Sequence, residues 1–285
     1  MYLMLVAERL ARRSLHRRGV LSGHFASSVG RLHYYESRAG GALPPIVILH
    51  GFGASATSYA PVLARLSPHT SRLLAPEAPG HGFSRAVRSG LSIDDAFAAV
   101  TELLDHHLDE PAILFGNSLG GAMALRYAAA APQRVRGLIL SSPAGAPMDP
   151  DELSAVVRSF TVGTLREASD LLGRLYNRAP WFAPLLSPDL LRHFADPTVR
   201  GLLESLQRQE FLSADELAAI QAPTLLLWGR GERLLPNAGL DFFRRHLPAH
   251  LAAIEEPADF GHCPYLDRPR QLAERITAFA RALTS

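Results

Sequence analysis

Three residues of this sequence have the types and the chain order needed for nucleophilic catalysis: Ser118, Glu232 and His262. A serine hydroxyl is a poor nucleophile until a base takes its proton, and a histidine imidazole commonly does so. A carboxylate in turn fixes the tautomer of the histidine and stabilises its protonated form. We therefore predict a relay in which Ser118 attacks, His262 moves the proton and Glu232 orients His262.

The sequence around Ser118 favours a sharp turn between a strand and a helix. Ser118 lies within Gly-Asn-Ser-Leu-Gly-Gly at 116–121, after the apolar run 113–115 and before the helix-forming run 122–128. This is the context of a nucleophile elbow, in which a strained backbone presents the hydroxyl and leaves no room for neighbouring side chains. Gly-x-Ser-x-Gly also arises by chance, so the interpretation depends on the partner residues.

Both partners are predicted to follow strands. His262 comes after Gly261 in the loop between the last predicted strand, 251–254, and the last predicted helix, 271–283. Glu232 follows the predicted strand 224–228, which gives the order serine, acid, histidine. The alternative acids are Asp149 and Asp259.

The remaining site residues are predicted from their neighbours. The backbone N–H groups of Leu119 and Phe52 are expected to form an oxyanion hole. His50, Asn117, Trp181 and Phe182 are predicted to contact the substrate, the last two from an apolar segment whose aromatic residues could equally form its own core. The twelve histidines form no close metal-binding pair, so no metal site is predicted.

The bulk composition is that of an ordinary globular protein. The chain has 285 residues, of which 47% are hydrophobic and 20% charged, and a formal net charge of +2. This balance gives no reason to expect a nucleic-acid partner. The single cysteine, Cys263, excludes an intrachain disulfide, and no apolar run approaches the roughly 20 residues of a membrane span. We expect a cytoplasmic protein, and the sequence leaves its oligomeric state open.

Strands and helices alternate along most of the chain, which predicts an α/β fold. Continuous apolar runs predict strands buried on both faces, as in a parallel sheet with helices on each side. Residues 46–49 are such a run, and further strands are predicted at 73–75, 113–116, 135–140, 224–228 and 251–254. Ligands bind beyond the carboxyl ends of strands in such sheets, where Phe52, Ser118, Glu232 and His262 all fall.

Three segments depart from the alternation. Residues 149–211 carry apolar residues at helical spacing and are predicted to be a helical cap inserted into a core formed by 23–148 and 212–285. Residues 25–29 and 32–36 are predicted to form a hairpin around Gly30-Arg31. Residues 1–22 form an N-terminal extension, predicted to be a basic amphipathic helix. Such a helix can contact an anionic membrane surface or pack on the protein.

Together these motifs resemble the α/β-hydrolase superfamily from Gly23 to the C-terminus. The motifs that stand in the family's order are His-Gly-Phe-Gly at 50–53, the run 75–84, the elbow 116–121, the loop 229–236 and Gly261-His262. The resemblance implies a mostly parallel eight-stranded sheet, a helical cap and a serine–acid–histidine enzyme without a cofactor. Glu232 and Glu77 stand where the family usually has aspartate.

The stretch 142–145 and the predicted cap are most similar to lipases and esterases of the monoacylglycerol lipase kind. This resemblance implies a carboxylic-ester hydrolase that acts through an acyl-enzyme on small-molecule esters or lipids with an apolar acyl chain. The Gly-Asn-Ser stretch is also similar to hydrolases that cleave carbon–carbon bonds of ring-fission products, although those usually carry tryptophan where this chain has Cys263. A non-catalytic ligand-binding protein is a third alternative.

Overall fold

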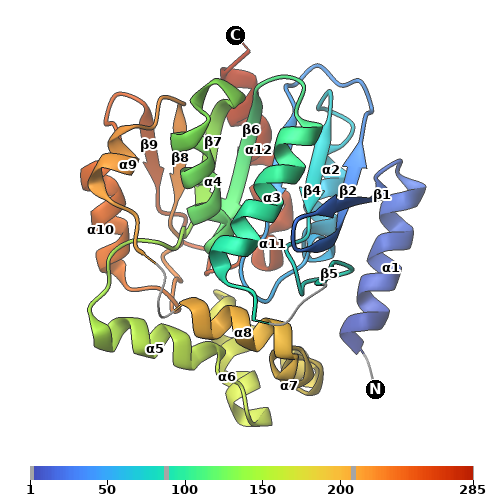
Figure 1. Cartoon of the computed structure of the whole chain (residues 1–285), viewed down its shortest axis with the longest axis vertical. Helices are drawn as coiled ribbons and strands as arrows, with labels where there is room; N and C mark the ends of the chain where they lie inside the picture. The colour runs from blue at the N-terminus through green and yellow to red at the C-terminus, as the bar shows by residue number, and fades with distance from the viewer. Residues whose placement is uncertain (1–2, 87–89, 207–209, 285) are drawn as a thin grey trace.

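A twisted sheet runs through the molecule in the order β1-β2-β4-β3-β6-β7-β8-β9, as Figure 1 shows; the short β5 pairs with β2 at its side. The structure is a computed structural model that describes residues 3–86, 90–206 and 210–284. The strands are β1 (Leu21–Ser27), β2 (Gly30–Ser37), β3 (Ile46–Leu49), β4 (Leu73–Pro76), β5 (Arg85–Ala86), β6 (Ala112–Asn117), β7 (Val135–Ser141), β8 (Thr224–Leu227) and β9 (Ala252–Glu255).

The pairing confirms the predicted, mostly parallel α/β sheet. Strand β3 pairs in parallel with β4 and β6, and β6, β7, β8 and β9 continue in parallel. Only β2 pairs antiparallel, with β1, β4 and β5, among the strands of the described ranges. The carboxyl ends of the parallel strands therefore meet at one edge of the sheet.

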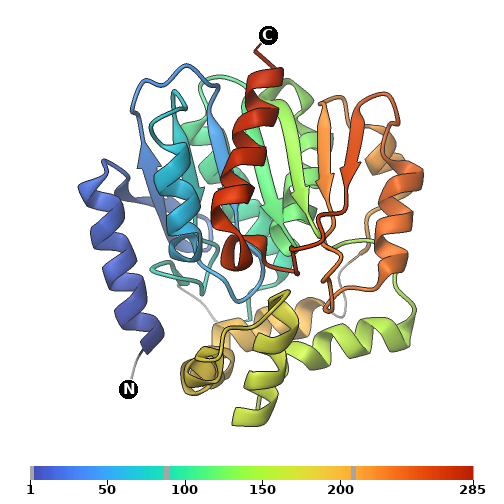
Figure 2. The same ribbon diagram turned by 180° about the vertical axis from the view of Figure 1, so that it is seen from behind.

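Helices cover both faces of the sheet. They are α1 (Leu3–Arg17), α2 (Ala60–Leu66), α3 (Ile93–His107), α4 (Leu119–Ala130), α5 (Pro150–Phe160), α6 (Leu165–Leu175), α7 (Ser187–Ala195), α8 (Pro197–Leu206), α9 (Ala214–Ala218), α10 (Asn237–His246), α11 (Pro264–Asp267) and α12 (Pro269–Ala282). Short 3₁₀ helices are η1 (Ala56–Tyr59), η2 (Pro132–Arg134) and η3 (Ala183–Leu186). Helices α3 and α4 lie in front of the sheet in Figure 1, whereas α2 and α12 lie on the opposite face, seen in Figure 2.

The apolar strands are explained by these two layers. Alternate side chains of a strand point to opposite faces. Ile46 and Ile48 of β3 pack with the α2–α12 layer, whereas Val47 and Leu49 pack with the α3–α4 layer. Both faces are covered, so both sets of positions must be apolar.

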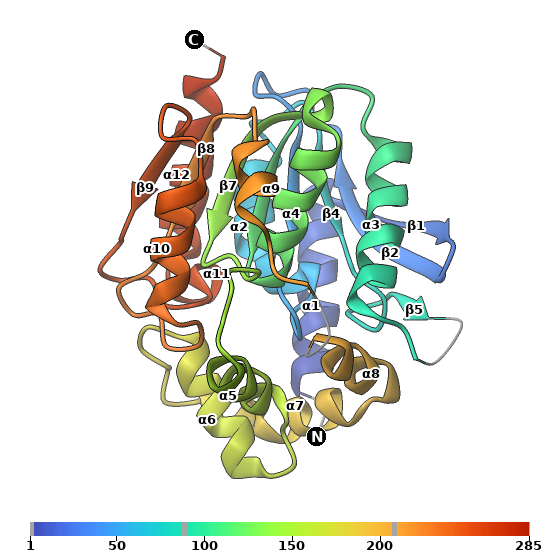
Figure 3. The same ribbon diagram turned by 60° about the vertical axis from the view of Figure 1, so that its left-hand side comes forward.

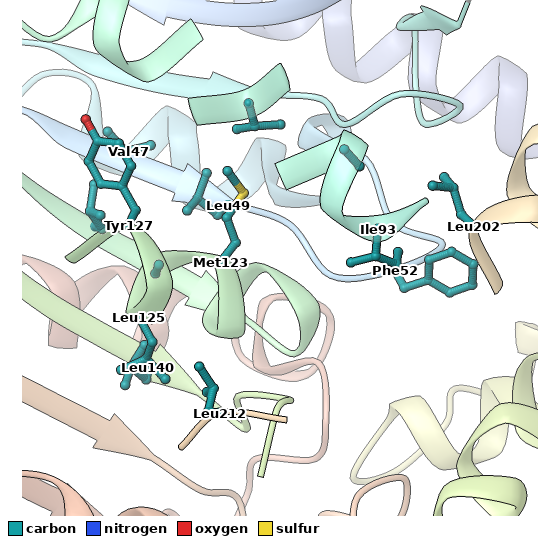
Figure 4. Close-up of a cluster of buried hydrophobic side chains, with 14 of the residues drawn as sticks. Val47, Leu49, Phe52, Ile93, Met123, Leu125, Tyr127, Leu140, Leu202 and Leu212 are labelled. Carbon is teal, nitrogen blue, oxygen red and sulfur yellow. The ribbon is translucent and has the colours of Figure 1, made fainter. Parts of the chain in front are cut away.

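The helices α5–α8 form a separate layer beyond the carboxyl ends of the parallel strands, at the bottom of Figure 1. Capping boxes start two of them, with Asp149 and Glu152 beginning α5 and Thr164 and Glu167 beginning α6. The side of this helical layer that faces the sheet packs against the hydrophobic core. Figure 4 shows Leu202 of α8 in one buried cluster with Phe52, which follows β3, and with residues of β3, β7 and α4. Residues 207–209 of the predicted cap lie outside the described residues.

Helix α1 packs on the body of the protein. The Glu8 carboxylate accepts a hydrogen bond from Ser55 Oγ at 3.0 Å, Leu15 is buried, and the Arg12 guanidinium lies 4.7 Å from the centre of the Phe83 ring. Its N-terminal end reaches the α5–α8 layer, where the Met4 N–H donates to Asp189 of α7 (Figure 3). Residues 1 and 2 of the predicted extension lie outside the described residues.

Two further findings bear on the predictions. None of the helices in the described ranges is both long and apolar enough to cross a membrane. The predicted hairpin forms, but its turn is Ser28-Val29 rather than Gly30-Arg31, because Ser27 pairs with Gly30. Ser28 is fixed there by Glu102 of α3, whose carboxylate accepts hydrogen bonds from the Ser28 N–H and Oγ at 2.9 and 2.5 Å.

Candidate active site

Ser118 occupies the sharp turn between β6 and α4. Its backbone has φ 54° and ψ −121°, a strained conformation for a non-glycine residue. The turn leaves no room for side chains beside it: a Cβ at Gly116 would lie 2.3 Å from Gly120 O, and one at Gly120 would lie 2.3 Å from Leu49 O. The predicted role of the two glycines is therefore explained by backbone crowding.

Glu232 and His262 meet at the same edge of the sheet. His262 Nδ1 lies 2.8 Å from Glu232 Oε2, and both side chains are almost fully buried. The other carboxylate oxygen, Oε1, accepts from the backbone N–H groups of Leu234 and Leu235 at 2.7 and 3.1 Å. These bonds hold a side chain one methylene longer than aspartate in a single position.

The ionisation of Glu232 fixes the tautomer of His262. Burial by itself would raise the pKa of Glu232. The positive charge of His262 when it is protonated, the hydrogen bond from His262 and that from the Leu234 N–H outweigh burial and lower this pKa to about 2. Because the ionised carboxylate only accepts, His262 Nδ1 carries the proton and donates it. The lone pair of Nε2 is then available to receive a proton from a hydroxyl.

The two alternative acids have other partners. Asp149 is the exposed N-cap of α5, where its Oδ1 accepts from the Glu152 N–H at 2.8 Å. Asp259 Oδ2 accepts from Arg268 Nε and Gln271 Nε2 at 3.0 and 2.8 Å. Of the three carboxylates considered from the sequence, Glu232 is the one hydrogen-bonded to His262.

Asn117 ties the loop of His262 to the strand of the nucleophile. Its Nδ2 donates to His262 O at 2.8 Å and to Ser141 O at 2.9 Å. Its Oδ1 is buried and has no hydrogen-bond partner within the part of the chain that the structure describes. The amide therefore has a positioning role that the sequence did not suggest, although it also lines the cavity described below.

His50 holds the turn that carries Phe52. Its ring is not free to contact a substrate, contrary to the prediction. Nδ1 lies 2.8 Å from Gly51 O and Nε2 accepts from the Ala78 N–H at 3.0 Å, so both nitrogens are engaged by the backbone. The Gly51 carbonyl and the Phe52 N–H belong to one planar peptide unit, so fixing the carbonyl also fixes the direction of this N–H. A Cβ at Gly51 would lie 3.1 Å from Ser118 Cβ, which brings this turn against the nucleophile.

His81 is a positioning residue that sequence reasoning missed. Its Nε2 accepts from the Gly53 N–H at 3.0 Å, and its Nδ1 lies 3.0 Å from Pro79 O. Burial, then the neighbouring His50 and His193, lower the pKa of His81 well below its usual value, so that the ring is neutral and can accept. Its signal in the sequence was its place in the 75–84 motif, which identifies no role for the ring.

The second predicted oxyanion donor, Leu119, begins α4. The first N–H groups of a helix lack partners within the helix and carry its positive dipole end. Phe52 and Leu119 line one cavity together with Ser118. The two N–H groups can therefore stabilise negative charge that develops on an oxygen bound beside Ser118.

Two cavities meet at Ser118, with Phe52 and Phe160 lining both. The α4 lobe is a cavity between the Leu119–Arg126 face of α4 and the Val156–Phe160 part of α5. The α7 lobe is lined by His262 and by apolar residues of α6 and α7. Ser118 and His262 thus border the same cavity.

Trp181 and Phe182 lie elsewhere, contrary to the prediction of substrate contact. They are 88% and 45% exposed and line neither lobe. The reason is their position on the turn before η3, where their rings face outward. The apolar walls of the two lobes come instead from the inner faces of α5, α6 and α7.

Comparisons with known proteins match most of the chain. A family model described as "alpha/beta hydrolase fold" matches residues 44–269. The chain is 30% identical over 257 residues to a pimeloyl-(acyl-carrier protein) methyl ester esterase of Xanthomonas campestris pv. campestris, covering 84% of this chain and 96% of the relative.

Solved structures share the fold across nearly the whole chain. A bacterial membrane phospholipase A superposes with a TM-score of 0.83 at 24% identity, covering 99% of this chain and 92% of that one. The 2-hydroxy-6-oxo-6-phenylhexa-2,4-dienoate hydrolase of Rhodococcus sp. strain RHA1 gives a TM-score of 0.77 at 22% identity, with coverages of 92% and 99%.

Proposed function

Because this chain belongs to the α/β-hydrolase family, we propose that it is a serine-dependent carboxylic-ester hydrolase. The observation that carries the proposal is the buried Glu232–His262 hydrogen bond at the edge of a cavity that Ser118 also lines. The relatives named as esterases support ester hydrolysis as the reaction class. The narrower likeness to monoacylglycerol lipases stays a prediction, as does contact of α1 with a membrane.

In the proposed mechanism Ser118 Oγ attacks the ester carbonyl while His262 Nε2 takes its proton. The N–H groups of Phe52 and Leu119 stabilise the negative oxygen of the tetrahedral intermediate. The bond from the carbonyl carbon to the leaving oxygen then breaks, and that oxygen receives the proton from His262. Water, activated by His262, releases the acid from the acyl-enzyme and restores the Ser118 hydroxyl.

Both lobes are lined chiefly by apolar side chains, which supports esters with apolar groups rather than sugars or peptides as substrates. The proposed substrates are therefore small-molecule or lipid esters.

Steady-state hydrolysis of p-nitrophenyl butyrate tests the proposal. We expect turnover by the wild type and a loss of kcat of about a thousandfold or more in Ser118→Ala. Ser159→Ala, which removes a hydroxyl that lines neither lobe, should retain full activity. A Ser118→Ala variant with wild-type turnover would contradict the proposal. Faster cleavage of a vinylogous diketone than of any ester would favour the carbon–carbon hydrolase alternative.

A further inference from the structure

On the basis of the proposed ester hydrolysis, we propose that the two lobes bind the two halves of the ester. The acyl chain occupies the α4 lobe and the leaving alcohol occupies the α7 lobe. The substrates are then esters of a neutral acyl chain of about eight carbons with an apolar alcohol.

The direction follows from where His262 lies. The leaving oxygen must receive its proton from His262, so the alcohol has to lie on the side of this residue. His262 lines the α7 lobe and is absent from the wall of the α4 lobe. Leu119, whose N–H is proposed to hold the carbonyl oxygen, lines the α4 lobe and not the α7 lobe. The acyl chain therefore extends along α4, away from His262.

One face of α4 sets the length of the acyl chain. Leu119, Ala122 and Arg126 line the α4 lobe and are three and four residues apart, which places them on the same face of the helix. An α-helix rises 1.5 Å per residue, so the backbone of Arg126 lies about 12 Å beyond Ser118. An extended chain advances about 1.2 Å per bond. Because helical side chains lean toward the N-terminus, the Arg126 side chain shortens the space to about eight carbons.

The far end of the α4 lobe is polar but does not present a free positive charge. The Arg126 guanidinium donates to Glu210 O at 2.7 Å and lies 3.4 Å from Asp94 Oδ1 and 3.9 Å from Glu216 Oε1. An acyl chain that ends in a carboxylate would approach these two acidic side chains as well as the guanidinium. We therefore expect a neutral methyl terminus to be preferred over an ω-carboxylate.

The α7 lobe is suited to an apolar alcohol. Leu172 of α6 and Leu190 and Phe194 of α7 contribute to its wall. Met4 of α1 also lines it and is held there by the hydrogen bond from its N–H to Asp189 Oδ2 at 2.9 Å. The N-terminal helix thus forms part of the wall that the leaving group meets.

Two matched substitutions separate the lobes. Val156→Phe adds bulk to the α4 lobe from α5, and Leu186→Phe adds bulk to the α7 lobe from η3; both original side chains are half-buried. Ala122→Leu fills the α4 lobe from its opposite wall and guards against a folding defect in Val156→Phe. Leu165→Phe, at an exposed position lining neither lobe, is the control.

The experiment measures kcat/KM for two series of esters. The first series consists of p-nitrophenyl esters whose acyl chains have two to twelve carbons, together with an eight-carbon ester whose acyl chain ends in a free carboxylate. The second series consists of octanoate esters whose alcohol varies from methyl to octyl. We expect a wild-type optimum near eight carbons and at least a tenfold lower rate for the ω-carboxyl analogue. Val156→Phe and Ala122→Leu should lower the octanoate-to-acetate ratio at least tenfold, whereas Leu186→Phe should lower the octyl-to-methyl ratio.

The opposite pattern overturns the assignment. If Leu186→Phe changes the acyl preference and the α4-lobe variants change the alcohol preference, the ester binds in the reverse direction. Equal ratios in all variants and the Leu165→Phe control would show that neither lobe binds the substrate as proposed. A wild type that cleaves none of the esters contradicts the proposed function itself, and a wild type that cleaves them with swapped or unchanged ratios contradicts only the assignment of the lobes.

Discussion

The Glu232 carboxylate lies 2.8 Å from His262 Nδ1, and two backbone N–H groups hold its second oxygen. The sequence resemblance raised the question of whether a glutamate could replace the usual aspartate. The longer side chain is accommodated because the N–H groups of Leu234 and Leu235 fix its far oxygen while the near oxygen reaches the imidazole.

Loss of the Glu232 charge should impair turnover severely. In Glu232→Gln an amide replaces the carboxylate that orients and stabilises the protonated His262, and we expect kcat to fall by about a thousandfold to ten thousandfold. Asp149→Asn changes the rival carboxylate at the start of α5 and should retain wild-type kcat. The assignment of the acid is wrong if the two variants behave the other way round.

Acid should weaken the folded state through Glu232. Its pKa is about 2 in the folded protein against an ordinary 4.5, so its ionised form stabilises the fold above pH 4.5. That contribution is lost as the pH falls through this interval toward 2. The difference in the free energy of unfolding between wild type and Glu232→Gln should therefore decrease as the pH falls from about 5 to about 2. A difference that stays constant with pH would contradict the proposed contribution of the ionised Glu232 to stability.

His81 should add a second, milder dependence on pH. Its folded pKa lies well below 6.5, so the unfolded chain takes up a proton at a pH where the folded protein does not. Stability is thus full above about pH 6.5 and falls as the pH drops below it. His81→Gln keeps an acceptor for the Gly53 N–H but cannot be protonated. In denaturant titrations between roughly pH 7 and pH 5, the free energy of unfolding should fall less steeply with pH in this variant than in the wild type. The same dependence on pH in both proteins would contradict this role of His81.

The elbow should not tolerate a side chain at Gly120. A Cβ there would lie 2.3 Å from Leu49 O, so Gly120→Ala must displace backbone and should lower the free energy of unfolding by about 3 kcal/mol or more. Gly173 of α6 is a matched control, because a Cβ there meets nothing within 4 Å. Gly173→Ala should stabilise by roughly 0.5 to 1 kcal/mol. Equal effects of the two substitutions in thermal or denaturant unfolding would argue against the crowding.

Much of the sheet could be predicted because burial on two faces leaves a clear pattern. Ile46–Leu49 is apolar at every position, and the strand has those bounds in the structure. The hairpin turn could not be placed correctly, because Gly30 is a good turn residue by its type. In the structure Ser27 pairs with Gly30, and the distant Glu102 accepts a hydrogen bond from the Ser28 N–H, a contact that no local pattern reports.

For the site, residue types and motifs predicted which residues belong to it better than they predicted where a side chain points. Ser118, Glu232 and His262 occur in motifs whose backbone context places them at one edge of the sheet. The prediction that His50 and Trp181 contact the substrate rested only on the residues next to them in the sequence. Whether a ring faces a cavity, the backbone or solvent depends on packing between distant segments, which no local sequence pattern predicts.

Covalent labelling tests the central claim, that Ser118 is the activated nucleophile, most directly. A fluorophosphonate loses fluoride as its phosphorus bonds to a serine oxygen activated by a base. After incubation with such a probe, intact-mass measurement and peptide mapping should show a single adduct, on Ser118, together with loss of esterase activity. Ser118→Ala should gain no adduct. Labelling of another residue, or full activity after Ser118 is labelled, would contradict the claim.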